Sequence, residues 1–371
     1  MSLGRLFPYI PFAGALVWNC NPSGGGPLKI HVSFSPDWFA ARMGLDYGER
    51  WHSDPMYRRK SFADMARALN REYPDLRLGG DPDAVRGGLS QIDGCALAAA
   101  VFGQDILFSS AGWPENRKAP MSDQAASRLR VPDLAGHPVV AGLLRQIEAC
   151  EREWGEVDGE LNYQGVLNTA FRLRGEQIFV DLVQEPERAD HVLGVVCDAM
   201  IGLARLVYER QAGTGVRKDY FVTSNCVVNM ISGEHYRRFV MPHDRRLAAS
   251  FGLFGVHNCG WNVDAYAAAY AELGGLEYLD FGTSSDLHRL RALFPAATLT
   301  PILNPEEVIG RSREEVRGLL CHLYDVLGEC RIILGSLDSR TRPEEVRSFF
   351  REAADIWGLA LEELVPQPHC G

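Results

Sequence analysis

Residues 253–282 read LFGVHNCGWNVDAYAAAYAELGGLEYLDFG and contain one complete strand–helix–strand pattern. Residues 253–257 and 276–280 are mostly apolar, and they end at His257 and Asp280. Both segments have the length and composition of buried strands. Residues 263–273, between them, are rich in alanine and favour a helix. Two such strands joined by a helix are typical of parallel pairing through a crossover connection.

The same alternation extends in both directions from this unit. Each strand-like segment precedes a helical pattern, and a long helix begins at Pro186, a residue that suits a first helical turn. The predicted strands are 161–164, 220–224, 253–257, 276–280, 298–303 and 331–334, and the predicted helices are 166–173, 186–210, 232–250, 263–273, 285–293, 313–327 and 343–357. Six units at this spacing favour a barrel over an open sheet. We therefore predict an α/β fold, a (β/α)8 TIM-like barrel, with residues 151–371 as its main part.

Residues 1–150 have a less regular pattern and form the predicted N-terminal extension. A helix is expected over residues 55–72, and residues 105–108 are a candidate short strand. The run Arg58-Arg59-Lys60 is typical of a solvated helix face. We expect this extension to supply the two missing strands, to cover the barrel, and either to govern substrate choice or to form a homodimer contact.

The composition restricts the class of protein. Of 371 residues, 46% are hydrophobic and 23% are charged, which is the balance of a globular protein. The net charge of −10 disfavours a nucleic-acid partner. Nine scattered cysteines argue against a disulfide framework and for a reduced compartment. No apolar run has the length of a membrane span, and residues 6–17 lack a basic start, so we expect an ordinary terminus and a cytoplasmic protein without a membrane partner.

The chemistry of a barrel is located where its strands end. His257 and Cys259 lie two residues apart on an extended segment and therefore point the same way. Imidazole and thiolate together suit zinc, which needs a third protein ligand in a catalytic site. The alternative is a buried cysteine beside a hydrogen-bonded histidine. The other candidates at strand ends are Tyr163, Gln164, Asn225, Cys226, Asp280, Asn304, Ser336 and Asp338.

Three segments resemble the uroporphyrinogen decarboxylase superfamily, and they lie closer to its corrinoid-dependent methyltransferases of the methylcobamide:coenzyme M type. These segments are GVLNTAFRLRG (165–175), ISGEHY (231–236) leading into MPHD (241–244), and HNCG (257–260). The resemblance implies that His257 and Cys259 are zinc ligands. It also implies that zinc lowers the pKa of an acceptor thiol, which then takes a methyl group from a corrinoid carried by a partner protein.

The third ligand departs from the family pattern. The relatives have a Gly-Cys step after the last strand, where this chain has Gly335-Ser336. Cys226, after the strand 220–224, and Asp338 are the possible replacements, and we prefer Cys226 because thiolate is the softer ligand. The alternative for Cys226 is a buried structural thiol.

The other polar candidates would bind substrate or support the metal. Asp280 would orient a ligand, support zinc from behind a ligand or contact substrate as a catalytic residue, and its alternative role is helix capping. Gln164, Asn225, Tyr163 and Asp338 are predicted to bind a small polar substrate. Two other functions remain open at this point: a decarboxylase or lyase of the same barrel, and a ligand-binding barrel without catalysis.

Overall fold

The computed structural model describes residues 16, 17, 28–84 and 88–364. Its main sheet has the strand order β1-β2-β9-β8-β7-β6-β5. Every pairing in this sheet is parallel except the antiparallel pair β1–β2. The strands are β1 (Leu16–Val17), β2 (Leu28–Phe34), β5 (Tyr220–Ser224), β6 (Leu253–His257), β7 (Leu276–Gly282), β8 (Thr298–Leu303) and β9 (Cys330–Leu337). The predicted terminus at residues 6–17 lies outside the described residues, apart from β1.

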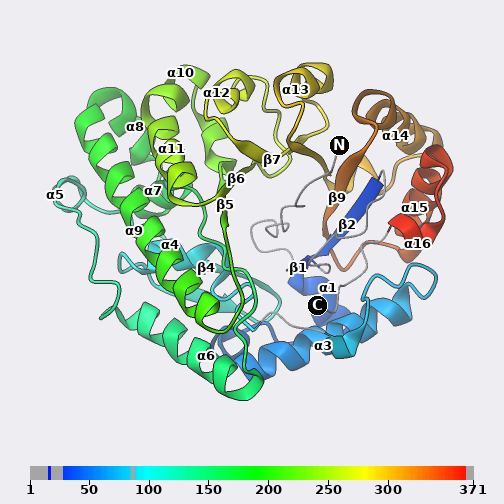
Figure 1. Cartoon of the computed structure of the whole chain (residues 1–371), viewed down its shortest axis with the longest axis horizontal. Coiled ribbons are helices and arrows are strands. Elements are labelled where there is room, and N and C mark those ends of the chain that lie inside the picture. The colour runs from blue at the N-terminus through cyan, green and yellow to red at the C-terminus, as the bar shows by residue number, and fades with distance from the viewer. Residues whose placement is uncertain (1–15, 18–27, 85–87, 365–371) are drawn as a thin grey trace.

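Helices lie on the outer side of this sheet, and the first and last parts of the chain meet where β2 pairs with β9 (Figure 1). Ser232 caps α10 and Pro186 opens α9, as the sequence predicted. The α-helices are α1 (Pro36–Met43), α2 (Glu49–Ser53), α3 (Pro55–Glu72), α4 (Leu97–Ala100), α5 (Asp123–Ser127), α6 (Pro138–Trp154), α7 (Val166–Arg174), α8 (Gln177–Gln184), α9 (Pro186–Gly213), α10 (Gly233–His235), α11 (Met241–Ser250), α12 (Ala267–Ala271), α13 (Leu287–Leu293), α14 (Arg313–Leu327), α15 (Pro343–Trp357) and α16 (Leu361–Leu364).

The two faces of the sheet differ in chemistry, because side chains alternate along a strand. Phe254 and Val256 of β6 and Leu279 of β7 belong to the main hydrophobic core. His257 and Asp280 occupy alternate positions on the same strands and therefore point to the opposite face. That face is where the polar side chains of the strand ends gather.

Five of the six predicted strands are confirmed, and the prediction of a strand at residues 161–164 is wrong. Residues 161–164 run beside β5, and the amide of Ser224 donates to the carbonyl of Gln164 at 3.2 Å. The amide of Gln164 instead donates to Oδ1 of Asn162 at 2.9 Å, and its φ is 62°. A left-handed residue whose N–H is bonded to a neighbouring side chain cannot continue a strand ladder.

Residues 89–91, which lie in turns, run beside this segment. The amide of Leu89 donates to the carbonyl of Asp158 at 2.9 Å, and that of Gln91 donates to the carbonyl of Glu160 at 3.1 Å. Backbone hydrogen bonds between neighbouring segments therefore continue past β5, first to residues 158–164 and then to residues 89–91. The strand pairings of the described residues include none that joins 89–91 to β2.

The first part of the chain differs from the prediction in two places. Its strands in the main sheet are β1 and β2, whereas the candidate at 105–108 forms β3 (Ile106–Ser109), which pairs only with β4 (Gly112–Asn116) in a separate hairpin. Arg58 is fully buried and is not part of a solvated face. Its guanidinium donates to backbone carbonyls of Trp51 and His52 and to Oε1 of Gln146.

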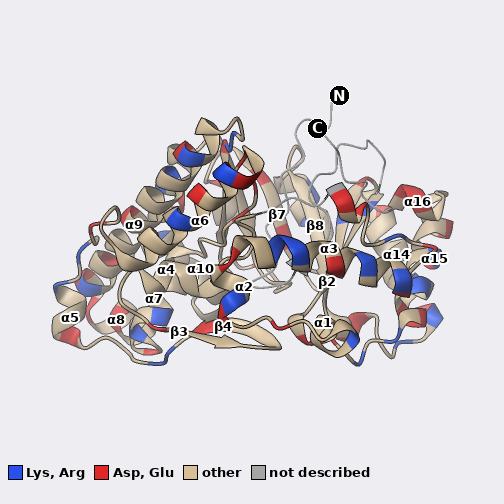
Figure 2. Ribbon diagram, turned by 90° about the horizontal axis from the view of Figure 1, so that it is seen from below, with Lys and Arg blue, Asp and Glu red and all other residues tan. Residues whose placement is uncertain are grey.

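The surface and the longest helix agree with a globular α/β fold. Basic and acidic residues are interspersed along the helices in the view of Figure 2. One helix among the described residues, α9, is long and apolar enough to span a membrane by length and composition. Half of its most apolar window is buried inside the fold, and the core helix of a globular protein meets the same criterion.

Candidate metal centre

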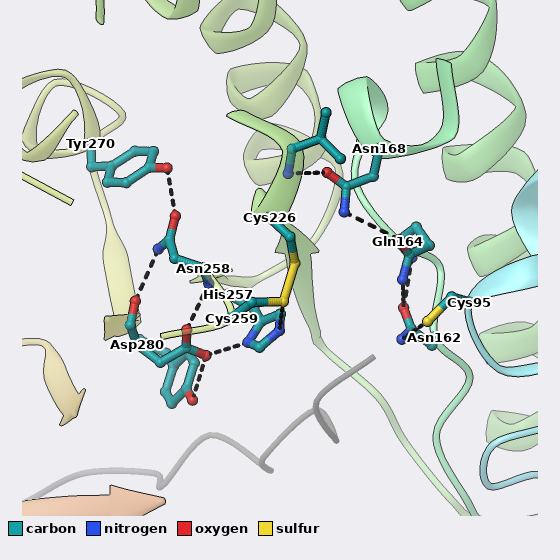
Figure 3. The surroundings of a disulfide bond; sticks show 12 residues. Cys95, Asn162, Gln164, Asn168, Cys226, His257, Asn258, Cys259, Tyr270 and Asp280 are labelled. Carbon is teal, nitrogen blue, oxygen red and sulfur yellow. Dashed lines mark hydrogen bonds and ion pairs between the residues drawn. A yellow bond between two sulfur atoms is a disulfide. The ribbon is translucent and has the colours of Figure 1, made fainter. Parts of the chain in front are cut away.

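Three side chains with metal-binding atoms meet at the carboxyl ends of β5 and β6 (Figure 3). The ligand atoms of Cys226, His257 and Cys259 all lie within 4.8 Å of one another. Ser224 pairs with His257 across the two strands, and a cysteine follows each of these residues two positions later. The Cα atoms of the two cysteines are consequently 5.5 Å apart. The structure thus brings together the three residues that the sequence analysis assigned to a metal.

The two sulfur atoms of this group are bonded to each other as a disulfide. The other described cysteines are free: Cys95, Cys150, Cys197, Cys321 and Cys330. One disulfide is no framework, but it is a departure from the expectation of reduced cysteines throughout. A metal-bound sulfur must be a thiolate, so disulfide formation and metal binding are mutually exclusive uses of the same pair. On reduction, the group offers two thiolates and one imidazole, and both cysteines are half-buried and reachable.

His257 is held in one orientation by Asp280. Its Nδ1 lies 2.7 Å from Oδ2 of Asp280, and both side chains are fully buried. A carboxylate only accepts hydrogen bonds, so Nδ1 carries a proton, and in the neutral imidazole Nε2 then carries the lone pair. Nε2 lies 3.1 Å from Sγ of Cys259. This is the carboxylate–histidine arrangement that orients metal-binding imidazoles.

Asp280 is itself fixed by several bonds, which excludes the capping role. Tyr278 donates its hydroxyl to Oδ2 at 2.9 Å, and the amide of Asn258 donates to Oδ1 at 2.6 Å. The side chain of Asp286, not Asp280, caps α13. Asp280 therefore connects the carboxyl ends of β6 and β7 through its hydrogen bonds to His257, Asn258 and Tyr278.

The backbone around Cys259 adopts an uncommon conformation. The φ of Cys259 is 54° and that of Gly260 is 76°, and left-handed non-glycine residues are concentrated at functional sites. Gly282 at the end of β7 lets this loop come close, because a Cβ there would lie 2.0 Å from the carbonyl oxygen of Gly260. The turn that points the sulfur of Cys259 toward Cys226 depends on this contact.

Asn225, the residue before Cys226, is bonded on two sides. Its amide donates to the carbonyl of His257 at 2.7 Å, and its Nδ2 donates to Oδ2 of Asp244 at 2.9 Å. Tyr236 donates its hydroxyl to the same oxygen at 2.8 Å. Burial raises the pKa of Asp244 to about 6, although the bonds from Asn225 and Tyr236 favour the charged form.

Val227, the residue after Cys226, is also held. Its amide donates to Oδ1 of Asn168 at 2.9 Å, and Nδ2 of Asn168 donates to Oε1 of Gln164 at 3.2 Å. Gln164 in turn donates from Nε2 to Oδ1 of Asn162 at 3.1 Å. A chain of buried amides therefore connects Gln164 to the loop that carries Cys226 (Figure 3).

Two predicted substrate residues lie away from this group. The ring of Tyr163 stacks on Phe221 with centroids 5.6 Å apart and belongs to the hydrophobic core on the helix side of the sheet. The carboxylate of Asp338 accepts from the guanidinium Nε of Arg340 at 2.8 Å and from the backbone amide of Arg340 at 2.9 Å. The metal-capable group of the described residues does not include Asp338.

Sequence reasoning did not assign roles to Asn168, Asp244 or Asn258. Asn168 and Asp244 occur inside segments that carry the family resemblance, and Asn258 lies between the two predicted ligands. A repeated dipeptide could have indicated that the residues before the two cysteines have a role. Asn225-Cys226 and Asn258-Cys259 are both Asn-Cys pairs directly after strands.

Comparison with solved structures supports the fold. A methyltransferase from Methanosarcina mazei superimposes with a TM-score of 0.60 at 14% sequence identity, covering 87% of this chain and 91% of that one. A B12-independent methionine synthase from a Shewanella species gives a TM-score of 0.38 at 11% identity, over 78% of this chain and 86% of that one. No family model matches the chain, and no curated protein matches it. At this identity the first likeness shows a shared α/β fold and nothing more.

Proposed function

We propose that this protein is a zinc-dependent methyltransferase that moves a methyl group from a corrinoid carrier to a thiol-type acceptor. The observation that carries the proposal is the group of Cys226, His257 and Cys259 at the ends of adjacent parallel strands. The sequence resemblance to corrinoid-dependent methyltransferases and the fold likeness to the Methanosarcina mazei methyltransferase support the same assignment.

The chemistry of the donor set fits zinc. Two thiolates and one imidazole are typical zinc ligands, and three protein ligands leave one position for a substrate. Zinc bound there would supply Lewis acidity that lowers the pKa of an acceptor thiol at neutral pH. Asp280 keeps the proton on Nδ1 of His257, so that Nε2 is the nitrogen able to bind a metal.

The remaining residues would bind and orient the substrate. Gln164 and Asn225 would contact the substrate, because hydrogen bonds connect Gln164 to the Cys226 loop and Asn225 to His257. Tyr163 and Asp338 are not assigned to substrate binding. The ring of Tyr163 packs in the core against Phe221, and the carboxylate of Asp338 is bonded to Arg340. Asp280 acts through His257.

We further infer that the sheet closes into an eight-stranded barrel. Residues 158–164 and 89–91 would supply the two positions between β5 and β2, next to the six parallel strands. The corrinoid would be bound to a separate protein that approaches the strand ends, where the half-buried cysteines are reachable.

Metal analysis of the reduced protein tests the proposal. We expect about one zinc per chain by the donor count, lost in Cys259→Ala and retained in Cys321→Ala, a control at a free cysteine of α14. The loaded protein should transfer the methyl group of methylcobalamin to simple thiols. Protein that cannot be loaded would refute the metal site, and loaded protein without transfer would refute the reaction.

A further inference from the structure

We propose that Asp244 and Asn168 are positioning residues that hold Cys226 where it can serve as the third metal ligand. This inference rests on the proposed metal site and adds to it. Cys226 begins a 3-10 helix (Cys226–Met230) and is half-buried, so once the disulfide is reduced its own packing does not fix its sulfur. The residues on either side of it are fixed instead.

On the first side, Asn225 transmits the position of Asp244. Asn225 is 1% exposed and Asp244 is fully buried. The bond between them measures 2.9 Å, and the amide of Asn225 also donates to the carbonyl of His257 at 2.7 Å. The chain entering Cys226 is therefore tied both to α11, which carries Asp244, and to the strand that carries the histidine ligand.

On the second side, Asn168 fixes the chain leaving Cys226. Asn168 lies on α7, is 4% exposed, and accepts the amide of Val227 at 2.9 Å through Oδ1. An unsatisfied N–H in this turn would cost free energy, so the bond restricts the turn to one position. Two bonds from different helices thus bracket a single cysteine.

The residue before the second cysteine is also hydrogen-bonded to a buried aspartate, although through different groups. Asn258 precedes Cys259 as Asn225 precedes Cys226, and Asn258 is bonded to Asp280 at both its amide and its Nδ2. Each Asn-Cys step is therefore attached to one buried aspartate. Because an attachment to a buried aspartate occurs before both cysteines, it is better explained as support for two ligands than as local packing at one of them.

Cobalt(II) substitution of the reduced protein separates this role from general stability. The thiolate-to-cobalt charge-transfer absorption increases with the number of thiolate ligands, and a mere loss of stability does not change it in folded protein. We expect Asp244→Leu and Asn168→Leu to lower cobalt affinity by about 10- to 100-fold and to reduce this absorption toward the one-thiolate value. Asp244→Asn should keep both, since an amide oxygen can still accept from Asn225. If a leucine variant does not fold, the alanine variant at the same position replaces it.

Gln211→Leu is the matched control. Gln211 is buried and donates to the carbonyl of Gly159 at 3.0 Å, but it lies near the end of α9 that leads to the amino end of β5, whereas Cys226 follows the carboxyl end of that strand. Its loss should leave the absorption unchanged. Normal two-thiolate spectra and affinity in both leucine variants would overturn this inference alone. A parent protein that binds no cobalt would overturn it together with the proposed metal site.

Discussion

Replacing Asp280 with asparagine should weaken zinc binding while leaving the fold largely intact. The amide oxygen of the new side chain would still accept from the backbone of Asn258, as Oδ1 of the carboxylate does at 2.6 Å. Its NH2 group would then face Nδ1 of His257, where Oδ2 of the carboxylate lies at 2.7 Å. Two donors cannot face each other, so the imidazole must move its proton to Nε2. A protonated Nε2 has no lone pair to offer a metal.

The size of this effect follows from the burial of the pair. Both side chains are fully buried, so water cannot substitute for the lost acceptor. Loss of such a partner lowers metal affinity by about 10- to 100-fold, which corresponds to roughly 1.4–2.8 kcal/mol. The metal-free fold should lose only about 1 kcal/mol, the difference between charge-assisted and neutral hydrogen bonds.

Zinc affinity of the reduced protein, measured by competition with a chromogenic chelator, checks the first number. Nitrogen NMR of His257 checks the tautomer directly. Asp338→Asn is the matched control, because that carboxylate is bonded to Arg340 and was the alternative third ligand. Unchanged affinity in Asp280→Asn, or a loss of equal size in Asp338→Asn, would refute the reasoning.

Three further predictions follow from the same geometry. Oxidised protein with the Cys226–Cys259 disulfide should bind no zinc in equilibrium dialysis and should regain binding on reduction with dithiothreitol; zinc uptake without free thiols would contradict this. Gly282→Ala places a Cβ 2.0 Å from a backbone oxygen of the loop after Cys259 and should cost about 1–3 kcal/mol in urea unfolding, whereas Gly318→Ala in α14, with open space around it, should stabilise by about 0.5–1 kcal/mol. The pKa of Asp244 is raised by burial to about 6, above its unfolded value of about 3.9, so its contribution to stability is full below pH 4 and is lost as the pH rises through 6. Metal-free Asp244→Asn should therefore gain up to about 3 kcal/mol over the parent between pH 4 and 7, and parallel stability curves would exclude this.

The sequence predicted the helical side of the fold better than its polar side. The strands β5 to β8 present apolar residues to the helices and were visible as apolar runs. β2 was missed because Lys29, His31 and Ser33 alternate with apolar residues along it. A strand with one polar face in the interior has the pattern of a half-exposed segment, and composition alone does not distinguish the two.

The sequence also did not predict that the charged side chain of Arg58 is buried. Arg58, Arg59 and Lys60 are neighbours in the chain, but each residue turns the helix by about 100°. Arg58 consequently faces inward and is buried, whereas Lys60 is exposed. One carbonyl group that satisfies the buried guanidinium, that of Gly88, comes from a loop 30 residues further along the chain, which local sequence does not place.

The third ligand shows how strand register adds to motif matching. Motif order alone pointed to the Gly335-Ser336 step, which lies near the carboxyl end of β9, where the amide of Ser336 donates to Oγ of Ser33 on β2. Register points to β5, because Ser224 pairs with His257 and a cysteine follows each strand by the same two residues. Parallel neighbours about 4.8 Å apart with equal offsets must bring those sulfurs together. A ligand set on β5 and β6 would therefore collect all three donors at the carboxyl ends of two adjacent strands.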